Sequence, residues 1–367
     1  MTRRLPTVLL FAACALGVAA DWPVFRGNAA MTGTADAKLP DQLDEVWEFA
    51  CQGDIRSAPA IVGNVVYVAS MDRHLYALDL ATGKEKWKVK LGSMEAGPAV
   101  KNGRVYVGDL EGKLHAVDAA TGKELWAFET MGEIHASANF ASDDILIGSH
   151  DSTLYRVTPA GKKVWEYKID GPINGAAAVA GDRTFAAGCD SLLHVIDTGT
   201  GKAVGSVDLG GQPAATAAVA GDFAYVGTVS GNSVLVVDWK TLKRGWEFAA
   251  KRRAQPFYSS AAVTDKLVVV GSRDRKIYAL DKATGAETWS VATEGNVDAS
   301  PVVAGGRVYV GSMASSGDFY VLDLATGTIK QQLALGSPVS GSAAVGADCL
   351  IVGTEKGRVV KLGAKKP

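Results

Sequence analysis

The sequence has almost no net charge, because its 38 Lys and Arg residues face 39 Asp and Glu residues. Such a balance gives no indication of binding to nucleic acid or to an anionic membrane surface. Beyond residue 20 the chain also lacks a run of about 18 apolar residues, the length that a membrane helix requires. We therefore predict no nucleic-acid partner and no transmembrane segment in the mature chain.

Cysteine is scarce, with four residues in a chain of 367. One of them, Cys14, lies in the first twenty residues, and the remaining three are Cys51, Cys189 and Cys349. Cys51 and Cys349 are assigned below to one sheet, where another strand separates them. Because three cysteines remain after residue 20 and they are far apart in the repeats, we predict no disulfide.

Histidine is also rare, and no His-x-Glu or His-x3-His spacing occurs among the five residues. His115 and His194 occupy strand positions where equivalent segments have tyrosine, which indicates packing rather than metal binding. His74 and His150 are expected in loops of separate repeats. The sequence therefore offers no histidine metal motif and no Ser-His-Asp arrangement.

Residues 1–20 have the pattern of an export signal. Arg3 and Arg4 precede a short apolar run, and small residues before Ala20 provide a cleavage site. The alternative is a lipobox ending at Cys14, which would be lipidated and become the N-terminus. Cleavage after Ala20 is the favoured interpretation, and in both cases the protein leaves the cytoplasm.

One short module recurs along the chain. Asp79–Trp87 (DLATGKEKW) returns at Asp118–Trp126 and at Asp281–Trp289. Asp and Thr side chains can bond a turn's own backbone, Gly supplies a positive φ, and Trp starts the next strand as a large apolar cover. With the weaker copies included, the last position of the module falls at Trp47, Trp87, Trp126, Trp165, Gly205, Trp246, Trp289 and Gln331. A period near forty residues with several short strands is typical of a β-propeller.

Each repeat contains four predicted strands, which in the first repeat are 58–62, 65–69, 75–79 and 85–89. Residues 44–49 resemble a fourth strand with no preceding three, whereas the C-terminus supplies three strands without a fourth. We therefore predict an all-β fold, an eight-bladed β-propeller over residues 44–363 with four antiparallel strands per blade. The N-terminal strand closes the last blade and removes the exposed sheet edges.

Residues 21–43 precede the propeller as an N-terminal extension. Trp22 and Phe25 are too apolar to be left in solvent, so we predict that the extension packs across one face of the disc. The alternative is a docking peptide for a partner.

The repeats resemble those of the pyrroloquinoline-quinone (PQQ)-like propeller superfamily over residues 44–363. The shared pattern is Ala-x-Asp-x-x-Thr-Gly-Lys-x-x-Trp, preceded by Ser-x-Pro-x-Val and Val-Tyr-Val-Gly. Eight blades, the chain length and the export signal are most similar to the BamB-type lipoproteins of outer-membrane barrel assembly. The opening Trp-Pro-x-Phe-Arg-Gly also resembles exported PQQ-like repeat proteins.

The resemblance implies a monomeric, non-catalytic scaffold for protein–protein interaction. It implies a location in the periplasm or on the periplasmic face of the outer membrane, and a protein partner such as a BamA-type barrel-assembly protein. The alternative is a propeller that binds PQQ or another small ligand in a redox or sensory role.

Quinone enzymes of the superfamily resemble one another in an adjacent Cys-Cys pair, a Trp beneath the cofactor and a calcium site of carboxylates and an amide. No two cysteines are adjacent here, and Trp239 is expected in a turn on the opposite face. We therefore predict no enzymatic activity and no cofactor, with PQQ and calcium as the alternative.

The loops that precede the innermost strands differ between repeats, whereas the Thr-Gly-Lys turns are uniform. In repeat proteins the variable face is usually the binding face. Equivalent positions in these loops are predicted to ring the mouth of the central channel: Arg56, Glu95, His135, Asn174, Ala214, Tyr258, Asp298 and Ser340. The favoured interpretation is a hydrated lining, and the alternative is a ligand site in which Glu95, Asn174 and Asp298 hold a hard cation.

The longest of these loops, residues 249–258, is the predicted partner contact. It combines Arg252 and Arg253 with Phe257 and Tyr258, which offers charge for steering beside aromatic anchors. Arg273 in the neighbouring loop would extend the patch, and the alternative is a solvated loop. The resemblance adds Asp298, because Val-Asp-Ala-Ser-Pro matches a strand start that helps the assembly lipoprotein bind its partner.

Overall fold

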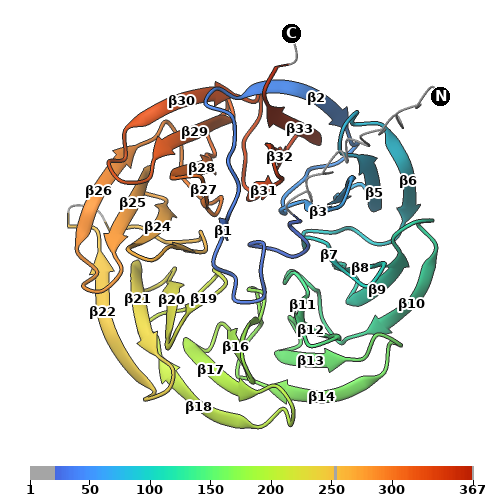
Figure 1. The fold of residues 1–367 in the computed structure, drawn as a ribbon. Coiled ribbons are helices and arrows are strands. Elements are labelled where there is room, and N and C mark those ends of the chain that lie inside the picture. The colour runs from blue at the N-terminus through green and yellow to red at the C-terminus, as the bar shows by residue number, and fades with distance from the viewer. Residues whose placement is uncertain (1–20, 252–253, 366–367) are drawn as a thin grey trace, which may run out of the picture.

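The computed structural model describes residues 21–251 and 254–365. The predicted export signal with Cys14, and the predicted contact residues Arg252 and Arg253, lie outside the described residues. Eight sheets surround a central axis, and Figure 1 shows the resulting wheel. The prediction of an all-β, eight-bladed propeller is therefore confirmed. The described residues contain no helix long and apolar enough to cross a membrane.

Each blade has four antiparallel strands ordered from the axis outward. Blades 1 to 4 consist of β3 (Ala60–Val62), β4 (Val65–Ala69), β5 (His74–Asp79) and β6 (Glu85–Lys90); β7 (Ala99–Lys101), β8 (Arg104–Gly108), β9 (Lys113–Asp118) and β10 (Glu124–Glu129); β11 (Asn139–Ala141), β12 (Asp144–Ser149), β13 (Thr153–Val157) and β14 (Lys163–Lys168); β15 (Ala178–Ala180), β16 (Arg183–Ala187), β17 (Leu192–Asp197) and β18 (Ala203–Asp208).

The second half of the ring repeats this order. Blades 5 to 8 consist of β19 (Ala218–Ala220), β20 (Phe223–Gly227), β21 (Ser233–Asp238) and β22 (Lys243–Ala249); β23 (Ala262–Val263), β24 (Leu267–Ser272), β25 (Lys276–Asp281) and β26 (Glu287–Ala292); β27 (Val302–Ala304), β28 (Arg307–Gly311), β29 (Asp318–Asp323) and β30 (Ile329–Ala334); β31 (Ala344–Val345), β32 (Cys349–Gly353), β33 (Arg358–Gly363) and β2 (Asp44–Ala50).

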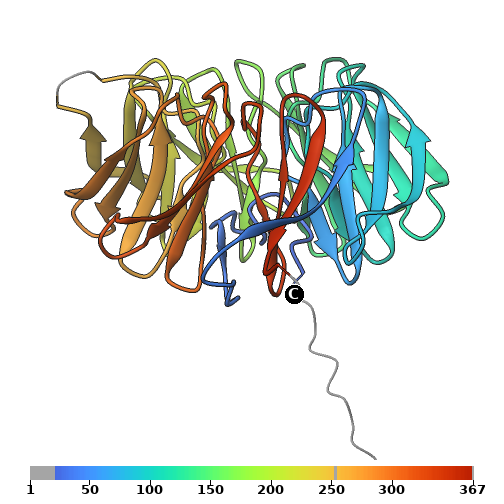
Figure 2. The ribbon, with the colours of Figure 1, turned by 90° about the horizontal axis from the view of Figure 1, so that it is seen from above.

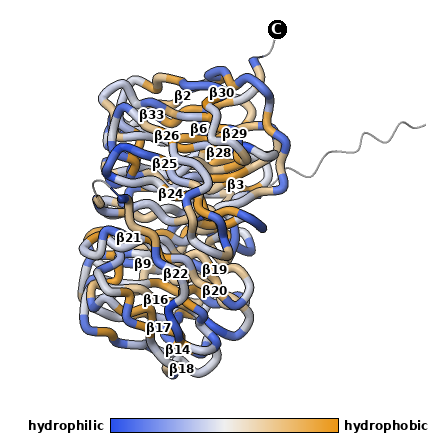
Figure 3. The backbone as a smooth tube through the Cα atoms, turned by 90° about the vertical axis from the view of Figure 1, so that its left-hand side faces the viewer, coloured by the Kyte–Doolittle hydropathy of each residue, from blue (hydrophilic) through white to orange (hydrophobic). Residues whose placement is uncertain are grey.

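The recurrent module forms the turn between the third and outermost strands of a blade. In blade 1 the Asp79 carboxylate accepts hydrogen bonds from the backbone N–H and the hydroxyl of Thr82, at 2.9 and 2.8 Å. Gly83 closes the turn at φ +72°, a conformation that L side chains rarely adopt. Apolar residues concentrate in the strands and hydrophilic residues in the connecting loops, as Figure 3 shows.

Tryptophan side chains lock neighbouring blades together. The Trp47 indole lies against Gly83 of the next blade, and its N–H donates to the Leu80 carbonyl oxygen at 3.0 Å. A methyl group added at Gly83 would lie 2.6 Å from the Trp47 ring, so only glycine fits beneath it. The same contact recurs at Trp87–Gly122, Trp126–Gly161, Trp165–Gly201, Trp246–Gly285 and Trp289–Gly327.

Two contacts between neighbouring blades lack the tryptophan, and in each of them other side chains make the contact. Gly205 replaces the tryptophan of blade 4, and Leu242 of blade 5 fills the vacated space in place of the usual turn glycine. Gln331 replaces the tryptophan of blade 7. Its side chain accepts from the Leu43 backbone N–H at 2.9 Å and donates to the Leu43 carbonyl oxygen at 2.7 Å.

The ring is closed by the N-terminal strand, as predicted. Strand β2 pairs antiparallel with β33 and becomes the outermost strand of blade 8. Arg358 of β33 forms ion pairs with Glu45 and Glu48 of β2. Segments more than 300 residues apart therefore share one sheet.

The N-terminal extension follows the inner strands around the axis. Trp22 is 2% exposed and exchanges backbone hydrogen bonds with Ile61 of β3. Further carbonyl oxygens of the extension accept from the inner strands or strand ends of blades 2, 4, 5, 6 and 7: Pro23 from Val100, Ala29 from Val179, Ala30 from Val219, Thr32 from Val263 and Gly33 from Val303. Strand β1 (Thr34–Ala35) then pairs parallel with β27 as a fifth strand of blade 7. Figure 1 shows this segment crossing the centre of the wheel.

Arg26 anchors the extension from within. Its side chain is fully buried, and Nη2 donates to the carbonyl oxygens of Ala261 and Pro301, at 3.2 and 2.5 Å. Burial lowers the pKa of the guanidinium to about 9. In Figure 2 the extension lies along the lower edge of the disc, where its hydrogen bonds to the inner strands of six blades carry it across the axis.

Candidate functional site at the channel mouth

The structure brings all eight equivalent loop positions together around one central cavity of about 180 Å³: Arg56, Glu95, His135, Asn174, Ala214, Tyr258, Asp298 and Ser340. Phe25 of the N-terminal extension also lines this cavity. The cavity is therefore a cup that opens toward the variable loops and is covered on the side of the Thr-Gly-Lys turns.

Hydroxyl groups beside this ring join neighbouring blades at several seams. The Oγ of Ser137 accepts from the Gly97 backbone N–H at 2.9 Å. Ser260 Oγ likewise accepts from the Thr216 N–H at 3.0 Å, and Ser300 Oγ accepts from the Ser260 N–H at 2.9 Å. These hydroxyls satisfy buried backbone donors, so their role is structural.

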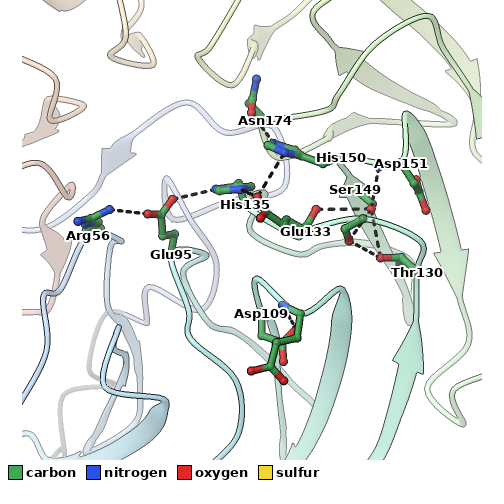
Figure 4. A network of polar contacts seen from close by, with 12 residues as sticks. Arg56, Glu95, Asp109, Thr130, Glu133, His135, Ser149, His150, Asp151 and Asn174 are labelled. Atoms are coloured by element: carbon green, nitrogen blue, oxygen red, sulfur yellow. Dashed lines mark hydrogen bonds and ion pairs between the residues drawn. The ribbon is translucent and has the colours of Figure 1, made fainter.

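One side of the cup is a chain of charged side chains. Arg56 Nη1 lies 2.6 Å from Glu95 Oε1, and His135 Nδ1 lies 2.8 Å from Glu95 Oε2. The hydrogen bond with His135, helped by Arg56, lowers the pKa of Glu95 to about 2. The same hydrogen bond is the main cause of the raised pKa of His135. Figure 4 shows the chain continuing beyond His135.

His135 and His150 form a stacked pair with ring centroids 4.1 Å apart. Glu133 Oε2 lies 2.8 Å from His135 Nε2 and 3.8 Å from His150 Nδ1. On the far side of the pair, His150 Nε2 lies 2.7 Å from Asn174 Oδ1. The sequence pattern does not single out Glu133, and it places His150 only in a loop of its own repeat.

The opposite side of the cup is a second charged cluster. Arg273 binds Asp298 with both ends of its guanidinium, Nε to Oδ1 at 2.9 Å and Nη2 to Oδ2 at 2.8 Å. The guanidinium carbon also lies 3.7 Å from the centre of the Tyr258 ring. The contact with Asp298 is the main cause of the raised pKa of Arg273.

The proposed hard-cation set is not assembled. Glu95 is bound by Arg56 and His135, Asp298 is bound by Arg273, and Asn174 bonds His150. Each of the three side chains therefore has its own partner in a different part of the cup. The interpretation of these residues as a joint cation site is corrected accordingly.

Phe257 is a core residue. It is 0% exposed and packs edge-on against Phe248, with ring centroids 6.5 Å apart. Its neighbour Tyr258 lines the cavity, because adjacent residues of an extended segment point in opposite directions. The prediction of Phe257 as a partner-contact residue is therefore wrong.

The other histidines of the strands bind carboxylates of their own chain. His115 is buried between Asp109 at 2.9 Å and Glu124 at 2.7 Å, and His194 lies 2.8 Å from Asp190. The predicted absence of a disulfide is confirmed for the described residues, where all three cysteines are free.

The lining of the cup differs from the pattern given above for the quinone enzymes of the superfamily. No tryptophan or cysteine is among the described residues that line it. Its volume of about 180 Å³ is below the roughly 300 Å³ at which small-molecule pockets usually begin.

A family model described as outer membrane protein assembly factor BamB matches residues 23–96, 81–158, 150–264 and 243–366. Among solved structures, BamB from Moraxella catarrhalis is 19% identical at a TM-score of 0.75, covering 88% of this chain and 100% of that one.

Two enzymes share the fold at similar scores. A europium-containing methanol dehydrogenase is 16% identical at a TM-score of 0.76, covering 94% of this chain and 98% of that one. A quinohemoprotein alcohol dehydrogenase from Comamonas testosteroni is 14% identical at a TM-score of 0.77, covering 95% of this chain and 82% of that one. At these identities the likeness extends to the fold alone, and no curated protein matches the sequence.

Proposed function

Because the chain belongs to the family of the outer membrane protein assembly factor BamB, we propose that it is a non-catalytic scaffold of the cell envelope. Its partner in this proposal is a BamA-type barrel-assembly protein, docked on the face that carries the variable loops. The observation that supports this choice most is the cup itself, which is small, lined by paired charges and covered on one side by the extension.

The loop face has the mixed chemistry of a docking surface. Met131, in the loop between β10 and β11, is 91% exposed, which is unusual for a large apolar side chain. Arg275, in the loop between β24 and β25, is an exposed cation beside the Arg273–Asp298 pair. An apolar anchor and rim charges together favour a protein partner over a small ligand.

The test is the affinity of the mature chain for the soluble periplasmic region of a BamA-type protein. Met131→Asp and Arg275→Glu should each weaken binding about tenfold or more, because one removes an anchor and the other reverses a rim charge. Lys123→Glu is the matched control, since Lys123 is also exposed but lies in a turn of the opposite face. Undetectable binding by the unmodified chain, or equal losses in all three variants, would refute the proposal.

A quinone-binding role is the second candidate, because one of the fold's neighbours is a quinohemoprotein alcohol dehydrogenase by name. It is tested by adding excess PQQ and calcium to the purified chain and following the melting temperature and the quinone absorption. Ligands that bind only the folded state raise its stability. A saturable stabilisation of several degrees would favour this candidate over the scaffold.

A further inference from the structure

We propose that Glu133, His135 and His150 form a binding site for a divalent transition metal ion of the zinc type, at the rim of the cup. Glu133 and His135 come from the loop between β10 and β11, and His150 comes from the hairpin between β12 and β13. The bound ion would tie the connection between blades 2 and 3 to the hairpin of blade 3. This site is independent of the proposed docking function.

The three ligand atoms already lie close together. They are all within 4.8 Å of one another. Metal–ligand bonds of about 2.0–2.2 Å in a tetrahedron place ligand atoms about 3.3 Å apart. The Glu133 Oε2 separations of 2.8 Å to His135 Nε2 and 3.8 Å to His150 Nδ1 bracket that value. His150 Nδ1 would move about half an ångström toward Glu133, and the two stacked rings, whose planes are 23° apart, would turn so that both lone pairs face the ion.

Neighbouring side chains present the correct nitrogen of each ring. The Asn174 side-chain oxygen can only accept, so His150 Nε2 carries a hydrogen and its Nδ1 lone pair faces Glu133. Glu95 accepts from His135 Nδ1, and the ion would displace the proton that Nε2 shares with Glu133 at 2.8 Å. Arg56 holds Glu95 in turn at 2.6 Å. Metal-binding histidines characteristically donate their second N–H to a carboxylate or a carbonyl oxygen in this way.

The ligand set selects the class of ion. Two imidazoles and one carboxylate suit zinc and its first-row neighbours, whereas magnesium and calcium prefer oxygen ligands alone. The Glu133 side chain is 55% exposed, so the site is reached from solvent without opening the fold. Three protein ligands leave a fourth position for water or for a side chain of a docked protein.

The test is a calorimetric titration of the tag-free, chelator-treated mature chain with zinc, with cobalt absorption as a second readout. One ion per chain should bind saturably, cobalt should give a tetrahedral spectrum, and magnesium should not compete. His150→Ala and Glu133→Gln should each weaken zinc binding at least tenfold. Asn174→Leu should weaken it by about 10 to 100-fold, because it removes only the group that orients His150.

Two control variants remove other side chains that could bind zinc. His74→Ala removes a half-buried histidine at the start of β5 beside Asp72, and His115→Gln removes the histidine held between Asp109 and Glu124. Both should bind zinc as the unmodified chain does, and melting curves should establish that every variant is folded. Absence of saturable zinc binding, or its persistence in a folded His135→Ala/His150→Ala double variant, would overturn the proposal.

Discussion

The contact between tryptophan and glycine at each blade seam predicts a large cost for one added methyl group. In Gly122→Ala the new Cβ would lie 2.7 Å from the Trp87 ring, closer than any real contact. Moving the indole strains the packing by about 1–3 kcal/mol and weakens its 3.1 Å hydrogen bond to the Ala119 carbonyl, worth about 0.5–1.5 kcal/mol. The positive φ of +74° adds about 1–2 kcal/mol for any L residue.

Gly103→Ala separates the packing cost from the backbone cost. Gly103 lies in the same blade at φ +71°, and a methyl group there meets nothing within 4 Å. Urea denaturation should therefore show a loss of about 1–2 kcal/mol for Gly103→Ala and of about 2.5–6.5 kcal/mol for Gly122→Ala. Equal losses in the two variants would refute the idea that the indole locks the seam.

Three further outcomes are expected. Gln331→Leu should lower the free energy of unfolding by about 1–3 kcal/mol in urea, because both backbone groups of Leu43 lose their partner. Phe257→Ala should lower it by about 3–5 kcal/mol, whereas a surface role predicts almost no change. Burial alone would lower the pKa of His115, but hydrogen bonds with Asp109 and Glu124 raise it overall. Its stabilisation is therefore full below pH about 6.5 and is lost as the pH rises through the higher folded value. The stability difference between the unmodified chain and His115→Gln should shrink from pH 6 to pH 9, and a constant difference would contradict this.

The architecture could be predicted because every repeat carries similar local sequence signals. The spacing of residues such as Trp87 and Trp126 sets the blade period, and the unpaired strand at residues 44–49 indicates how the ring closes. The path of the N-terminal extension could not be predicted. Arg26 is a charged residue, which sequence patterns place in solvent, yet it is fully buried and bonds carbonyl oxygens more than 200 residues away.

The candidate site, like the fold, could be predicted only in part. Positions equivalent by repeat, such as Arg56 and Asp298, could be placed at the channel mouth from register alone. The partners of these side chains could not, because Arg273 comes from the hairpin of the preceding blade. The cluster of Glu133, His135 and His150 joins a loop to a hairpin fifteen residues further on, a spacing that matches no familiar motif.

The most direct test of the scaffold role is photo-crosslinking in living cells that produce a BamA-type protein. A photoreactive side chain replaces Met131 on the variable-loop face in one strain and Lys123 on the opposite face in another. We predict a crosslink to the barrel-assembly protein from position 131 and none from position 123. A crosslink from position 123 alone, or from neither position, would contradict the account.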